Sequence, residues 1–161
     1  MEETIVEFLK KSLYEKIFLY NDLLLCFKKE KEALAIMDMD NLWNISEEKD
    51  ELCSKINSIR QKMFSAVGSE TGQQYLTPAM IMDLVPEKNR SKFHELYYAL
   101  RKLKNEINVM RELNMHAVDH SLKFLDEIIS IITGQVRHDV IYNGRCRLNQ
   151  SGSNMILSRE V

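Results

Sequence analysis

The side chains best suited to chemistry are Glu112, His116 and His120, which follow one another at intervals of four residues. This spacing places all three on one face of a helix, and two histidines at i and i+4 can share a metal ion. A zinc site needs a third or fourth protein ligand, and Ala117 stands where the zinc-protease motif has its glutamate. We therefore interpret the three side chains as a solvated polar face, and we expect no cofactor.

Catalysis by an activated nucleophile is not indicated either. The sequence has no glycine-rich phosphate loop and no GxSxG motif, so nothing pairs a nucleophile with its base. Cys26, Cys53 and Cys146 lie far apart without CxxC spacing, which is typical of reduced and unreactive thiols. We expect a protein that binds partners and is not an enzyme.

Composition and charge restrict the class of partner. The 161 residues are 45% hydrophobic and 29% charged, which is ordinary for a single soluble domain. A net charge of -2 offers no basic surface to nucleic acid. No apolar run approaches the ~20 residues of a membrane span, and the start, MEETIVEFLKK, lacks a signal-peptide pattern. We expect a cytoplasmic protein that neither binds nucleic acid nor inserts into a membrane.

Helices account for most of the predicted fold. Five glycines and two prolines are few for this length, and apolar residues recur at intervals of three and four. The pattern predicts helices at about residues 4–37, 40–67, 78–84 and 87–133. These elements would form a helical domain over residues 1–134, followed by a flexible tail over residues 135–161.

The first two long helices are predicted to form an antiparallel hairpin. Short polar side chains between them, Asp38, Asp40 and Asn41, favour a turn or a helix start. A tight connection forces two helices of similar length side by side. The expected fold class is therefore all-α, a coiled-coil hairpin joined by a third long helix. No glycine marks the junction, so a continuous bent helix is the alternative.

The end of the last predicted helix is its most apolar part. One row at intervals of three and four, here called the apolar seam, runs the whole length of this helix and consists of Leu96, Leu100, Leu103, Ile107, Met110, Asn114, Ala117, Ser121, Phe124, Ile128 and Ile131. From Val118 onward a second apolar row, Leu122, Leu125, Ile129 and Ile132, lies beside the seam, and at 100° per residue the apolar arc widens to roughly 180°. No other segment of the chain is predicted to pack against this surface. Its opposite side is polar, so we expect a helix that is covered by another protein chain.

Four further side chains allow more than one interpretation. Asn114 lies in the apolar seam of the last helix, where a polar residue can set the register of packing at some cost in stability. Trp43 and the pair Tyr97 and Tyr98 could anchor an interface, but we favour packing in the core for them.

The segment KEKEALAIMDMDNLWNISEEKDEL resembles the FlgN family of flagellar export chaperones. The matching features are a lysine-glutamate-apolar helix end, an aspartate turn, leucine-like residues spaced by three and a glutamate-lysine pair. The second half is similar to the family at Asn114, Ala117, Val118, Ser121, Leu122, Phe124, Thr133 and Gly134, and YNGR at residues 142–145 resembles the start of the family's tail. Arg111 departs from the pattern, since the family commonly has asparagine there, and Ala117 and Val118 are smaller than the usual leucines.

The resemblance implies a cytoplasmic chaperone of the flagellar type III export apparatus. It would bind the carboxy-terminal helices of the hook-associated proteins FlgK and FlgL, prevent their premature assembly and deliver them to the export gate. By the same resemblance Tyr142 would dock to the export-gate protein FlhA. The cargo-binding residues would be Asn114, Val118, Leu122, Phe124, Leu125, Ile128, Ile129 and Ile132.

The alternative is a self-associating coiled-coil protein with a structural or adaptor role and no exported client. Its apolar stripe would be closed by a homodimer of the free protein.

Overall fold

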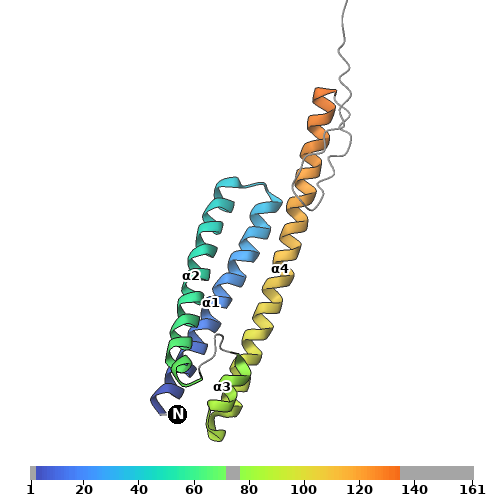
Figure 1. Ribbon diagram of the computed structural model, residues 1–161. Coiled ribbons are helices and arrows are strands. Elements are labelled where there is room, and N and C mark those ends of the chain that lie inside the picture. The colour runs from blue at the N-terminus through green and yellow to red at the C-terminus, as the bar shows by residue number, and fades with distance from the viewer. Residues whose placement is uncertain (1–2, 72–76, 135–161) are drawn as a thin grey trace, which may run out of the picture. The chain divides into compact units, whose positions relative to one another are not determined.

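The computed structural model describes residues 3–71 and 77–134, and the only regular elements in these ranges are helices (Figure 1). They are α1 (Glu3–Ala35), α2 (Met39–Thr71), α3 (Pro78–Leu84) and α4 (Glu87–Thr133). The all-α prediction is confirmed. The predicted tail, residues 135–161, lies outside the described residues, so the boundary at residue 134 stays a prediction.

The chain divides into two compact units, residues 1–120 and residues 121–161, called unit 1 and unit 2 below. Each is described by itself. Unit 1 contains α1, α2, α3 and most of α4, whereas the described part of unit 2 is the last stretch of α4.

Helices α1 and α2 pack against each other and run in opposite directions (Figure 1). The predicted antiparallel hairpin is therefore confirmed, and a continuous bent helix is excluded. Helix α2 continues to Thr71, beyond its expected end near residue 67. Gly68 does not stop it, because one glycine costs a helix only about 1 kcal/mol relative to alanine.

The turn between the two helices is built around Met37, whose φ is 55°. The N–H of Met37 donates to the carbonyl of Leu34 at 3.3 Å, and the N–H of Asp38 donates to the carbonyl of Ala33 at 3.0 Å. These two hydrogen bonds define a Schellman motif, whose left-handed position is usually occupied by glycine. The Asp38 carboxylate then accepts the N–H of Asn41 at 3.1 Å and caps α2. The hairpin thus forms without a glycine.

We expect Met37→Gly to raise the free energy of unfolding by about 0.5 to 1 kcal/mol, because a left-handed conformation is strained for methionine and not for glycine. The Met37 side chain is 48% exposed, so its removal leaves no cavity in the core. Urea denaturation followed by circular dichroism measures the change. Met39→Gly is the control, because Met39 is exposed and lies in the first turn of α2, where glycine brings no relief of strain. A decrease in stability for Met37→Gly would contradict the account of this turn.

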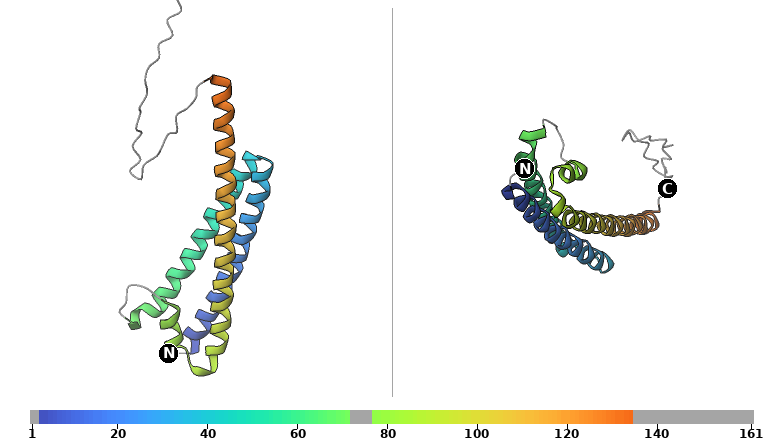
Figure 2. Two further views of the ribbon diagram at one scale, coloured as in Figure 1. Left: turned by 90° about the vertical axis from the view of Figure 1, so that its right-hand side faces the viewer. Right: turned by 90° about the horizontal axis from the view of Figure 1, so that it is seen from below.

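The core of unit 1 consists of two apolar clusters. The first draws on all four helices and includes Leu9, Leu13, Ile81 and Phe93, and three of these, Leu9, Leu13 and Phe93, have no exposed surface. The second joins α1 and α2 to α4 through Ile107. Within unit 1, α4 therefore lies along the α1–α2 hairpin (Figure 2). Burying the apolar stripes of three helices is the main source of stability.

Helix α3 closes one end of the first cluster. It begins as the sequence predicts, with Thr77 as the N-cap and Pro78 as the first helical residue. The Thr77 hydroxyl accepts the N–H of Met80 at 3.3 Å. Ile81 and the C-cap residue Val85 are buried in the cluster, which fixes the position of the short helix.

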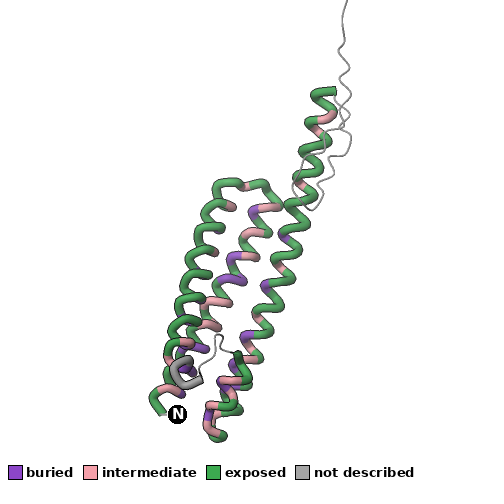
Figure 3. Tube along the Cα trace, viewed as in Figure 1, coloured by how far each residue is buried: buried purple, intermediate pink, exposed green. Residues whose placement is uncertain are grey.

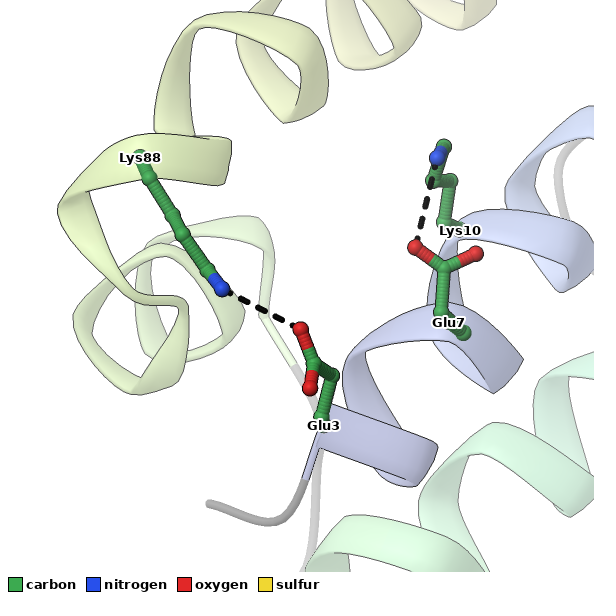
Figure 4. A network of polar contacts seen from close by, with 4 residues as sticks. All are labelled: Glu3, Glu7, Lys10 and Lys88. Atoms are coloured by element: carbon green, nitrogen blue, oxygen red, sulfur yellow. Dashed lines mark hydrogen bonds and ion pairs between the residues drawn. The ribbon is translucent and has the colours of Figure 1, made fainter.

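The amino terminus of α1 and the beginning of α4 are joined at the surface of unit 1. Lys88 Nζ lies 3.1 Å from Glu3 Oε1, and within α1 Lys10 Nζ lies 3.3 Å from Glu7 Oε1 (Figure 4). Both pairs are exposed, so each contributes at most about 1 kcal/mol. The apolar cluster holds this end of the unit together, and the ion pairs add little.

Candidate functional site

The apolar seam of α4 changes from buried to exposed at Asn114. The buried side chains of α4 include Leu96, Leu100 and Ile107, and Asn114 is the last of them in the chain. Beyond it the seam residues Ala117 and Phe124 are exposed. Figure 3 colours most of this end of α4 as exposed. The two parts of one continuous seam therefore have different surroundings.

Asn114 connects the three long helices through a small polar network. Its Nδ2 donates to the carbonyl of Phe27 and to Glu30 Oε2, both at 2.9 Å. Both partners are acceptors, which fixes the orientation of the amide. Glu30 also pairs with Lys49 of α2, whose Nζ lies 4.9 Å from the centre of the Phe27 ring. The Asn114 amide thus joins α4 to α1 by two hydrogen bonds, which is consistent with a residue that sets the register of packing.

The same network places Asn114 away from any exposed surface. Its side chain is 4% exposed, and its Oδ1 is buried without a hydrogen-bond partner. Of the predicted cargo-binding residues that the structure describes, Asn114 is the one whose side chain is already buried between helices. The structure assigns Asn114 to the contact between helices, and an additional contact with cargo would require that contact to open.

The remaining predicted cargo-binding residues are on the surface or close to it. Val118, at the end of unit 1, is 39% exposed. In unit 2, four side chains at intervals of three and four share one face of α4 and are 42% to 77% exposed. These four, here called the C-terminal apolar face, are Leu122, Leu125, Ile129 and Ile132.

Further apolar side chains widen this face. Phe124 and Ile131 are exposed beside it, while Ile128 is partly buried. A contiguous set of large exposed apolar side chains on a helix is typical of a surface that binds another molecule. Its chemistry is apolar contact, and it contains no arrangement that could activate a nucleophile.

Glu112, His116 and His120 are all exposed. In residues 3–71 and 77–134, no group of three histidine, cysteine or acidic side chains is placed so that it could hold a metal ion. Cys26 is buried, and its burial raises the pKa of the thiol, which makes it less reactive. No helix in the described part of the chain has the length and apolarity needed to cross a membrane.

The aromatic residues differ from expectation. Packing in the core is wrong for Trp43 and Tyr98, which are 71% and 64% exposed. It is right for Tyr97, which is partly buried against the first cluster, where burial raises the pKa of its hydroxyl. Adjacent residues on a helix point about 100° apart, so Tyr97 and Tyr98 cannot both face the core.

One feature of unit 1 was not predicted. Lys16, Arg60, Arg101 and Lys104, from three different helices, line a single groove. Only the i, i+3 spacing of Arg101 and Lys104 is visible in the sequence. The other two basic residues join them through tertiary packing, for which the sequence carries no local signal.

Comparison with known proteins gives one match. A family model described as FlgN protein matches residues 1–150. No curated protein and no solved structure matches the chain. The match covers all four helices, the C-terminal apolar face and the four basic residues that line the groove.

Proposed function

Because the chain belongs to the FlgN family, and is therefore a flagellar export chaperone, we propose that its clients are the hook-associated proteins FlgK and FlgL. We further propose that it binds their carboxy-terminal helical segments in the cytoplasm and releases them to the export gate. This function requires neither catalysis nor a cofactor.

The observation that carries the proposal is the exposure of the C-terminal apolar face. An amphipathic helix binds a partner helix by covering apolar side chains at intervals of three and four, which is the pattern at Leu122, Leu125, Ile129 and Ile132. A cargo helix with an apolar face for later assembly needs such a cover before export. The proposed contact residues are Val118, Leu122, Phe124, Leu125, Ile128, Ile129 and Ile132.

The size of this face is sufficient for a specific but reversible complex. Burial of a large apolar side chain contributes about 1.5 to 3 kcal/mol, so several partly exposed ones could contribute on the order of 10 kcal/mol. Ordering and association remove much of this amount. When about 4 kcal/mol is lost in this way, about 6 kcal/mol remains, which corresponds to a dissociation constant of about 50 μM. A complex of this strength can be released at the gate.

The proposal is tested by co-expressing the full chain with tagged carboxy-terminal segments of FlgK and FlgL and measuring how much chaperone each segment captures. We expect capture by at least one segment. If neither segment captures a folded chain, the proposed clients are wrong. A homodimer that persists on dilution in light scattering and does not respond to either segment would then support the self-associating alternative.

We propose that Tyr142 docks the chaperone to the export-gate protein FlhA. The family match extends over this residue, which lies outside the described residues. Tyrosine is a frequent anchor of interfaces, and loss of such an anchor costs about 2 kcal/mol or more. We expect Tyr142→Ala to weaken FlhA binding about thirtyfold in titration calorimetry, by the relation of tenfold per 1.4 kcal/mol.

Capture of FlgK and FlgL segments is the control for Tyr142→Ala and should not change, because Tyr142 is not one of the proposed cargo-binding residues. Tyr142→Phe separates the hydroxyl from the ring. Unchanged FlhA affinity of Tyr142→Ala would remove this residue from the docking site.

A further inference from the structure

Unit 1 has a groove of about 1150 Å³ whose lining includes no residue of the C-terminal apolar face. Residues of α2 and α4 supply most of its lining, and α1 and α3 contribute two residues each. Part of the lining is apolar, including Leu13 and Met63 from the first core cluster. Leu13 and Met63 are buried beneath the groove, so the apolar surface within reach of a ligand belongs to Phe64, Tyr97 and Tyr98.

The charged residues that line this groove are all basic. Lys16, Arg60, Arg101 and Lys104 line it together with His94, and its lining includes no aspartate or glutamate. In the part of the chain that the structure describes, none of the four lysine and arginine side chains forms an ion pair. This is a local excess of positive charge in a chain whose net charge is -2.

The basic side chains are close enough to affect one another. The pKa of Lys16 is lowered, first by its burial and then by the positive charges of Lys104 and Arg60. For a lysine, a lowered pKa means that the folded protein holds the proton less tightly than the unfolded chain does, so the charged form opposes folding below that pKa. Groups that reduce stability in this way are characteristic of binding sites.

Two of the positive charges lie close to aromatic rings. Arg101 Cζ lies 5.9 Å from the centre of the Tyr98 ring, and Lys104 Nζ lies 5.5 Å from that of Tyr20. Tyr98 lines the groove and is 64% exposed. Apolar, aromatic and basic side chains are thus combined in one concave surface, which resembles the centre and rim of a protein interface.

We infer that this groove, here called the cationic groove, binds an acidic amphipathic helix of a partner protein. The apolar side of that helix would cover Phe64, Tyr97 and Tyr98, and its carboxylates would pair with Arg60, Arg101 and Lys104. Its lining residues on α4 extend from His94 to Lys104, about 15 Å at 1.5 Å per residue, which matches about three helical turns of the partner. The partner helix would lie against α2 and α4 and complete a four-helix arrangement.

Charge and shape favour an acidic helix over three other possible ligands, namely the chain's own residues 135–161, a lipid surface and nucleic acid. The chain's own residues 135–161 contain four arginines against Asp139 and Glu160, so the groove repels them. A lipid surface is too broad to reach apolar residues inside a groove between helices. Nucleic acid would gain from the basic residues but would leave the apolar lining uncovered.

The test uses the full chain and a labelled synthetic helix of about five turns, with leucines at heptad spacing and glutamates on both flanks. Fluorescence anisotropy measures its affinity for the wild type and for the Arg60→Glu, Arg101→Glu variant. The matched control is Lys62→Glu, Lys102→Glu, because these lysines lie on the same helices, are exposed and do not line the groove. Circular dichroism checks that both variants keep the helix content of the wild type.

We expect the groove variant to bind the acidic helix at least about thirtyfold more weakly, and the control less than about threefold, because charge reversal acts through nearby opposite charges. Wild-type affinity should fall as NaCl rises from about 0.05 to about 0.5 M, which shortens the screening length about threefold. Equal affinities of the groove and control variants would overturn the inference. So would tighter wild-type binding of phosphatidylglycerol vesicles, of single-stranded DNA, or of the same peptide with lysines in place of glutamates.

Two variants distinguish a failure of the cationic-groove inference from a failure of the proposed cargo site. The Leu122→Asp, Leu125→Asp variant should keep its affinity for the acidic helix, because neither leucine lines the groove. The groove variant should still be captured by FlgK or FlgL segments. A loss of acidic-helix binding in the Leu122 and Leu125 variant would overturn the inference of a separate site.

Discussion

Replacing Leu122 and Leu125 together by aspartate is expected to abolish capture of the FlgK and FlgL segments. Both leucines are exposed in the structure, at 56% and 42%, so the new carboxylates stay hydrated in the free chaperone. In a complex they would have to leave water for an apolar surface, which costs several kcal/mol for each unpaired charge. We expect an affinity loss of about a thousandfold or more, at tenfold per 1.4 kcal/mol.

The fold should tolerate this double substitution. Aspartate lowers helix propensity by about 0.5 kcal/mol relative to leucine, which is small for a helix as long as α4. The matched control is His120→Asp, Lys123→Asp, which places two aspartates at the same spacing on exposed positions outside the C-terminal apolar face. Capture should persist in this control. Capture of the Leu122 and Leu125 variant at the wild-type level would show that cargo binds elsewhere.

The second large effect is on stability. Phe93→Ala is expected to lower the free energy of unfolding by about 3 to 5 kcal/mol, because it leaves a cavity where a large ring was fully enclosed. The Phe93 side chain is 0% exposed and packs in the first core cluster with residues of α1, α2 and α3. A typical domain has only about 5 to 15 kcal/mol of stability, so this loss is a large part of the total. Urea denaturation followed by circular dichroism measures it.

Phe18→Ala makes the same chemical change on the surface and is the control. Phe18 is 69% exposed on α1, so its loss should cost less than about 1 kcal/mol. Similar losses for both variants would mean that α4 is not held on the hairpin by Phe93.

The helices of this protein could be predicted from the sequence because their signals are local. Apolar periodicity located the long helices, and Thr77 followed by Pro78 located the start of α3. The cap at Asp38 was also visible. The left-handed Met37 was not, since methionine has no preference for that conformation and is held there by the surrounding hydrogen bonds.

The candidate site could be predicted in part. The apolar face of Leu122, Leu125, Ile129 and Ile132 follows from spacing alone, and these residues are exposed as a binding surface requires. Whether a seam residue faces another helix or solvent depends on tertiary packing. For this reason the sequence pattern did not show that burial on α4 ends at Asn114. The cationic groove depends on packing even more strongly, because Lys16, Arg60 and Arg101 are distant in the chain.

The end of burial at Asn114 has a consequence for local unfolding. Buried side chains earlier in α4 can open only when the core opens, whereas the mostly exposed residues that follow can lose helix while the core of unit 1 stays closed. A partner that requires this stretch to be helical must stabilise it against fraying. The apparent affinity of the chaperone therefore includes the intrinsic helix propensity of polar residues such as Lys123 and Glu127, although they lie outside the C-terminal apolar face.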